Sequence, residues 1–200
     1  MSAALVPPFE IGNETIPRKR FTRGEVERLA EVGIFEGQRY ELIDGDLIDK
    51  MGQKPLHATG IQLLMVALLR LFDGIQIRVQ LPIEVSDADR ERSVPEPDFA
   101  ILGAYKSEYA DRHPRGDELL LVIEVSDTTL SLDLKRKASL YAAAGVPEYW
   151  VLDVVRRSLI VHKHPEGAIY RLRQLLSDAD TVQIEGARES LSIREILPAV

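Results

Sequence analysis

Two carboxylates in strand-like surroundings are the residues of this chain best suited to chemistry. Glu124 interrupts the run from Leu119 to Val125, which is otherwise apolar, and burying a charge there is costly unless something pairs with it. Asp98 follows Pro97 at the head of another short strand-like segment. Carboxylates on two neighbouring strands form an oxygen-rich pocket of the kind that Mg²⁺ or Mn²⁺ prefers. For an arbitrary pair, the plainer alternative is that Glu124 binds a core arginine and Asp98 merely begins a strand.

Three further polar residues recur at intervals of four after that strand. Asp133, Lys137 and Tyr141 therefore share one face of the helix predicted over residues 132–144. Because this helix follows Glu124 closely, its first turns can lean over the strand end. There Lys137 could stabilise charge on a phosphate and orient an attacking water. Taken alone, the spacing fits an exposed Asp133–Lys137 pair with Tyr141 in the core better.

The remaining patterns predict a mixed α/β fold with one strand–helix–strand crossover in the second half. Thr22 and Glu25 form a capping box at a helix start, and Asp44-Gly45 is a hairpin turn dipeptide. Periodicities of three and four indicate helices, and alternation indicates strands. The predicted elements are a helix over 22–32, a hairpin over 40–48, a helix over 57–72, strands over 75–85, 98–102 and 119–125, a helix over 132–144, strands over 148–154, 159–162 and 168–172, and a helical turn over 193–197.

Composition places the chain among ordinary globular proteins, with 200 residues, 45% hydrophobic and 28% charged. We expect a loose lead-in over residues 1–20 and one domain over residues 21–200. The absence of cysteine excludes disulfides, thiolate zinc sites and cysteine nucleophiles, and agrees with a reducing cytoplasm. The segment from Met1 to Phe9 lacks a signal-peptide pattern, and no apolar run approaches the roughly 20 residues that cross a bilayer. We therefore expect a cytoplasmic protein without a membrane partner.

The formal net charge of −7 counts against stable binding of nucleic acid, because phosphate affinity comes largely from lysine and arginine. Local clustering softens this objection, and a bound divalent cation would offset acidic residues at a site. The basic residues form two runs, Arg18, Lys19, Arg20 and Arg23, then Lys135, Arg136 and Lys137. The charge is compatible with a nuclease that meets its substrate briefly.

Several blocks, in order, resemble the Uma-type endonuclease family of the PD-(D/E)XK nuclease superfamily. The resemblance covers roughly residues 20–165, and its most distinctive block is Gly-Val-Pro-Glu-Tyr-Trp. It implies a restriction-endonuclease-like core, with a mixed central β-sheet flanked by helices and a metal at the strand ends. The matching blocks are Tyr-Glu-Leu-Ile-Asp-Gly (40–45), His57 at a helix start, Pro97-Asp98, Leu-Val-Ile-Glu-Val-Ser (121–126), Asp133, Lys137 and Tyr141, and Gly-Val-Pro-Glu-Tyr-Trp-Val-Leu-Asp (145–153).

The resemblance implies roles for individual residues. Asp98 and Glu124 would be the two catalytic acids that hold Mg²⁺ or Mn²⁺, and the backbone carbonyl of Val125 could add a metal contact. The position that usually holds the motif lysine is Ser126, on the same strand face as Glu124. The family pattern suggests that Lys137 takes over the role of that lysine.

The roles of five possible accessory residues, Ser126 among them, remain open from the sequence alone. Glu41 would be an additional acid near the pocket, acting through a water, or a satisfied hairpin residue. His57 could approach a substrate from the helix start, although a lone histidine there more often caps or packs. Asp133 and Tyr141 are possible members of the site through the helix face that they share with Lys137.

The C-terminal half offers two weaker signals. His162 and His164 lie two apart on one strand and could bind a metal, but an exposed pair on an outer strand is the simpler interpretation. Tyr149 and Trp150 are expected to pack a strand instead of stacking bases. The hairpin that includes residues 159–162 could offer an edge for pairing, and we expect a homodimer.

Three functional hypotheses follow. The first is a metal-dependent endonuclease that hydrolyses phosphodiester bonds of nucleic acid, most simply DNA. The second is a catalytically inactive binding or regulatory module with the nuclease fold, which the acidic balance and Ser126 favour. The third is a hydrolase of a small phosphate compound. The sequence contains no Gly-rich phosphate loop, nucleophile elbow or zinc-protease helix.

Overall fold

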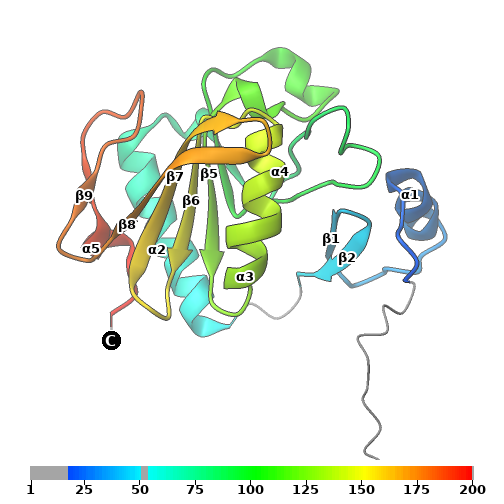
Figure 1. The fold of residues 1–200 in the computed structure, drawn as a ribbon, viewed down its shortest axis with the longest axis horizontal. Coiled ribbons are helices and arrows are strands. Elements are labelled where there is room, and N and C mark those ends of the chain that lie inside the picture. The colour runs from blue at the N-terminus through cyan, green and yellow to red at the C-terminus, as the bar shows by residue number, and fades with distance from the viewer. Residues whose placement is uncertain (1–17, 51–53, 200) are drawn as a thin grey trace, which may run out of the picture.

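The computed structural model describes residues 18–50 and 54–199, and a six-stranded mixed sheet organises them (Figure 1). Its strand order is β3-β4-β5-β6-β7-β8. The β5–β6 pair is parallel, and the other four neighbouring pairs are antiparallel. The strands of this sheet are β3 (Ile77–Val79), β4 (Phe99–Leu102), β5 (Leu119–Ser126), β6 (Glu148–Asp153), β7 (Ser158–Glu166) and β8 (Ile169–Leu176).

Helices cover both faces of the sheet, as the predicted fold class requires (Figure 1). On β5, Ile123 and Val125 pack toward α2 and α5, whereas Val122 packs toward α4 on the opposite face. This two-sided burial explains the nearly continuous apolar run of β5. The helices are α1 (Arg23–Glu31), α2 (Pro55–Leu71), α3 (Leu130–Leu132), α4 (Ala138–Ala143) and α5 (Ile193–Ile196). No helix in the described part of the chain is long and apolar enough to span a membrane.

A small N-terminal hairpin stands beside the main sheet, near α3 (Figure 1). It joins β1 (Tyr40–Ile43) to β2 (Asp46–Asp49), and its turn residues Asp44 and Gly45 both have positive φ, as a type I′ turn needs. A bridge from Leu42 to Val94 ties the hairpin to the segment that leads into β4. The capping box predicted at the start of α1 is also present.

The predicted strand over residues 75–85 was too long. Its first residues form a 3₁₀ turn over Gly74–Gln76, and β3 ends at Val79, because Gln80 takes a positive φ of 49°. β7 pairs with β6 on one side and β8 on the other, so the hairpin that includes residues 159–162 presents its edge at β8 and not at β7. The short pair β9 (Thr181–Val182) and β10 (Leu191–Ser192) was not predicted.

The two C-terminal histidines do not form an exposed pair. His162 is buried, stacks on Tyr149 with ring centroids 5.4 Å apart, and also contacts Tyr170, whereas His164 is exposed. Tyr149 and Trp150 are fully buried in β6 and pack the sheet, as expected. The proposed lead-in lies largely outside the described residues, but Arg20 at its end forms an ion pair with Asp46 at 2.7 Å.

Gly60 lets α2 approach the carboxyl ends of β5 and β6. A Cβ atom there would lie 3.0 Å from Val125 Cγ1 and 3.1 Å from Val154 Cγ1. We expect Gly60→Val to lower the free energy of unfolding by about 1–3 kcal/mol in urea denaturation, because overpacking displaces the helix. Gly24→Val is the control, since a Cβ there meets only the end of Arg28 at 3.5 Å. Equal effects of the two substitutions would contradict the close-packing argument.

Burial lowers the pKa of His162 to about 4, below its ordinary value in the unfolded chain. The folded state therefore binds fewer protons than the unfolded state between pH 6.5 and about 4, and stability must fall as the pH drops through that window. We expect urea denaturation at pH 7.5 and pH 5 to show a larger loss of stability for the native chain than for His162→Phe. An identical loss in both proteins would assign the acid sensitivity to other groups.

Candidate active site

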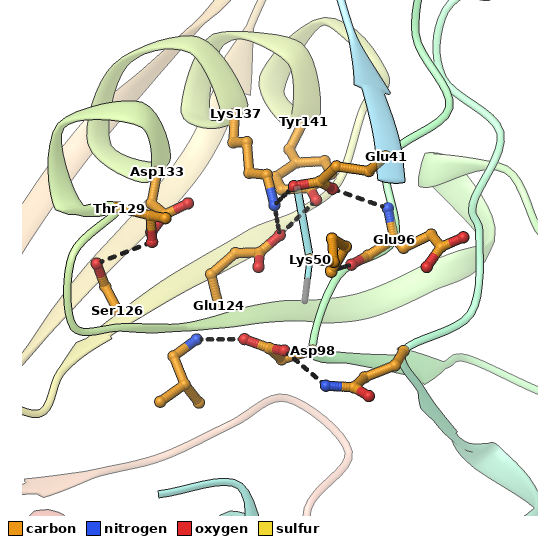
Figure 2. A network of polar contacts seen from close by, with 12 residues as sticks. Glu41, Lys50, Glu96, Asp98, Glu124, Ser126, Thr129, Asp133, Lys137 and Tyr141 are labelled. Atoms are coloured by element: carbon orange, nitrogen blue, oxygen red, sulfur yellow. Dashed lines mark hydrogen bonds and ion pairs between the residues drawn. The ribbon is translucent and has the colours of Figure 1, made fainter. Parts of the chain in front are cut away.

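Glu124 lies near the carboxyl end of β5, on the sheet face that α4 covers, and only 3% of its surface is exposed. Its Oε1 atom accepts hydrogen bonds from Lys137 Nζ at 2.9 Å and Tyr141 OH at 2.7 Å (Figure 2). Lys137 and Tyr141 are both on the helix that follows β5, as the intervals of four predicted. The alternative in which Glu124 binds a core arginine is wrong.

Lys137 also joins Glu124 to the N-terminal hairpin. Its Nζ atom lies 2.7 Å from Glu41 Oε1, and all three side chains are buried (Figure 2). The other Glu41 oxygen accepts a hydrogen bond from the backbone N–H of Glu96 at 3.2 Å. Glu41 therefore contacts the cluster directly instead of through a water. The alternative of an exposed Asp133–Lys137 pair is likewise wrong, because both residues are buried.

The helix that carries Lys137 contains a π-helical turn over Asp133–Lys137, between α3 and α4. Such turns widen the helix locally and often occur at functional sites. The Asp133 carbonyl accepts a hydrogen bond from Tyr149 OH at 3.1 Å, and its carboxylate accepts one from Thr129 Oγ1 at 2.6 Å. Asp133 is thus fixed by β6 and by the loop after β5.

Asp98 stands immediately before β4, in which Phe99 pairs with Ile123. Continuing that register places Asp98 opposite Glu124, and directly opposed antiparallel residues project to the same face. Asp98 Oδ2 accepts a hydrogen bond from the backbone N–H of Val125 at 2.8 Å and lies 3.3 Å from His57 Nε2.

The other Asp98 oxygen, Oδ1, accepts a bond from Gln80 Nε2 at 3.3 Å (Figure 2). Arg39 in turn contacts Gln80 Oε1 at 3.3 Å and Glu96 at 2.9 Å. The positive φ that ends β3 thus turns Gln80 toward Asp98.

The pKa values of Glu124 and Asp98 shift in opposite directions, because their charged neighbours differ. Burial raises the pKa of Glu124; Lys137 opposes the shift, whereas the negative charges of Asp98 and Glu41 add to it. Burial also disfavours ionised Asp98, but the hydrogen bond with His57 and the charge of Lys50 outweigh it, so the pKa of Asp98 is lowered.

The negative charges of these acids raise the pKa values of the neighbouring His57 and Lys137. The pKa of His57 is raised, because Asp98 outweighs the effect of burial. The pKa of Lys137 is raised although burial opposes this, since Glu124 and Glu41 attract its charge. Burial raises the pKa of Asp133, with Lys137 opposing the shift.

These side chains surround one cavity of about 120 Å³ at the carboxyl end of β5. Six carboxylates line it against three lysines and one histidine, so negative charge dominates. The lining residues that matter for chemistry are Glu41, Asp98, Glu124, Asp133, His57, Lys50, Lys54 and Lys137.

The chain matches a family model over residues 24–195, which is most of its length. The chain belongs to the Uma2 family. That family is described as "Putative restriction endonuclease". A solved structure with the same fold is a "putative nuclease belonging to DUF820" from Anabaena variabilis, at a TM-score of 0.60 and 12% identity, over 80% of this chain and 90% of that one. A comparison with curated proteins found no match.

The donor set of this Uma2 site fits a hard divalent cation. Both of these hydrogen bonds to Glu124 use Oε1, and no described residue donates a hydrogen bond to Oε2. In the described part of the chain, no three His, Asp or Glu side chains already converge to hold an ion. Mg²⁺ commonly uses one or two carboxylates and completes its shell with water and substrate phosphate, which is what Asp98 and Glu124 could support.

Ser126 stands at the sequence position of the usual motif lysine, but its neutral hydroxyl cannot supply the charge of a lysine. Its Oγ atom lies 3.4 Å from Thr129 Oγ1, at the base of the helix that carries Asp133. Lys50 and Gln80 are the site residues that the sequence analysis missed. The alternating residues around Gln80 predict a strand and give no sign of the turn there. For Lys50, the sequence gives no sign of a role in the site beyond its place two residues after Ile48 in the hairpin.

We expect Lys137→Met to lower the free energy of unfolding by about 3–5 kcal/mol in urea at pH 7, because Glu41 and Glu124 would lose their shared buried cation. Adding Glu124→Gln to that variant should restore part of the loss. Arg70→Met is the control, since Arg70 pairs with Glu189 and Glu195 at the surface and should change stability little. If Lys137→Met and Arg70→Met lowered the free energy of unfolding equally, the contacts of Lys137 with Glu41 and Glu124 would not stabilise the fold as argued.

Proposed function

We propose that this Uma2 chain is a metal-dependent endonuclease that hydrolyses phosphodiester bonds of DNA. The observation that carries the proposal is the convergence of Asp98 and Glu124 on one acidic cavity, beside Lys137. Family membership supports nuclease activity and a nucleic-acid substrate. The choice of DNA follows the family's description as a restriction endonuclease.

In this proposal Asp98, Glu124 and the Val125 carbonyl hold Mg²⁺ or Mn²⁺. When bound, the ion would polarise the phosphate and lower the pKa of a water. Burial raises the pKa of Glu124 and the charge of Lys137 opposes that rise, so the role of Lys137 is to favour the ionised carboxylate and to hold it in place.

The other side chains position these groups. Tyr141 fixes Glu124 Oε1 through its hydroxyl, and His57 fixes Asp98 Oδ2. Glu41 and Glu124 take two of the three N–H donors of Lys137, and the third can orient the attacking water. The bond from water oxygen to phosphorus forms as the bond to the leaving sugar oxygen breaks, the water releases its proton to solvent, and the leaving oxygen takes up a proton from solvent.

Two further expectations remain proposals. A homodimer would let two sites act on the two strands of a duplex, and the outer strand β8, which pairs only with β7 in the main sheet, offers an edge for association. We also propose one domain over residues 21–200 in the cytoplasm.

Isosteric replacement of the two acids tests the proposal. We expect Asp98→Asn and Glu124→Gln to slow Mn²⁺-dependent nicking of supercoiled plasmid by on the order of a thousandfold, because several kcal/mol of charge stabilisation would be lost. Calorimetric titration should show weaker Mn²⁺ binding in both variants. Glu189→Gln, at an exposed acid on the surface, is the control and should cut normally.

Two outcomes would count against this assignment. Variants that cut as fast as the native chain would remove Asp98 and Glu124 from the active site. A native chain that binds Mn²⁺ and DNA but cuts neither DNA nor RNA would favour a binding or regulatory module. Ser126, which replaces the usual motif lysine and faces Thr129, is the observation that keeps this second candidate open.

A further inference from the structure

The cavity holds a second ammonium group close to the two acids. Lys50 directly follows β2, is half-buried, and lines the cavity together with Asp98 and Glu124 (Figure 2). Its backbone N–H donates to the carbonyl of Arg39 at 2.9 Å, which closes the open end of the hairpin. The same hairpin therefore brings Glu41 and Lys50 to the site.

The ammonium group of Lys50 binds an uncharged backbone carbonyl, whereas that of Lys137 binds two carboxylates. Its Nζ atom donates to the backbone carbonyl of Glu96, and no carboxylate among the described residues lies within 4.0 Å of it. Lys137, by contrast, is 3% exposed and is shared by Glu41 and Glu124. A lysine ammonium has three N–H donors, so Lys50 keeps donors for a ligand in the cavity.

The charge of Lys50 also acts inside the cavity. Burial raises the pKa of Asp98, while first His57 and then Lys50 lower it. At Glu124, burial again raises the pKa, and the charge of Lys50 opposes the shift together with that of Lys137. The field of Lys50 therefore reaches both acids, and a phosphate beside them would meet the same field.

We propose that Lys50 is a further catalytic residue, whose ammonium contacts the substrate phosphate and stabilises negative charge on its non-bridging oxygens. Lys137 then remains the internal counter-ion of Glu41 and Glu124. The proposal rests on the proposed nuclease function. In this role Lys50 acts only through its charge and its N–H donors, and it neither gives nor takes a proton as the phosphorus–oxygen bonds exchange.

A purely structural role would be to clamp the Glu96 carbonyl, two residues before Asp98. The two roles predict different measurements on Lys50→Met. We would compare single-turnover nicking of plasmid DNA at saturating Mn²⁺, the Mn²⁺ dissociation constant by calorimetry, and the thermal midpoint. Lys106→Met is the matched control, because Lys106 is an exposed lysine that pairs with Glu118, outside this cavity and outside both basic runs.

We expect Lys50→Met to cut 10²–10³-fold more slowly, with an unchanged thermal midpoint and Mn²⁺ binding at least as tight as in the native chain. Binding should tighten because a positive charge near the acids is lost. Lys50→Arg should recover part of the rate, and Lys106→Met should cut at the native rate.

Three results would overturn the proposal. Native-rate cutting by Lys50→Met would remove Lys50 from catalysis while leaving the nuclease function intact. Weaker Mn²⁺ binding or a lower thermal midpoint in parallel with the lost rate would assign Lys50 to the clamp. A native chain that cuts no nucleic acid would overturn the nuclease function itself, and the catalytic role of Lys50 with it.

Discussion

The ammonium group of Lys137, buried between Glu41 and Glu124, is the interaction on which the rest of the site depends. Glu41 comes from the N-terminal hairpin, Glu124 from the centre of the sheet, and Lys137 from the crossover helix. A buried carboxylate without a counter-charge would be protonated or would destabilise the fold. One lysine therefore joins three elements and provides the counter-charge for two buried acids.

The geometry around this ion pair comes from local departures from regular structure. A π-helical turn carries Lys137, and Tyr149 from β6 bonds to a carbonyl within that turn. A positive φ at Gln80 ends β3 early and brings its amide to Asp98. Gly60 allows α2 to approach closely enough for His57 to contact the same acid. Each irregularity therefore positions a side chain that lines the cavity or that contacts Asp98 there.

The excess of acids in the cavity and the net charge of −7 have related consequences. A site with more carboxylates than ammonium groups attracts a divalent cation, and it repels a polyanion until that cation is present. Lys50 differs from Lys137 because its ammonium has no carboxylate partner among the described residues. Under the proposal that Lys50 contacts the substrate, Lys137 supplies the charge balance inside the protein.

Local patterns in the sequence determined the order of the elements, the capping box at Thr22, the hairpin turn at Gly45, and the presence of acids at Asp98 and Glu124. These features depend on neighbouring residues, so periodicity and turn chemistry reveal them. The direct contact of Glu41 with Lys137, the turn at Gln80, the burial of His162 and the place of Lys50 were decided only by the tertiary structure. Each depends on which distant segment packs nearby, and a linear pattern carries no record of that proximity.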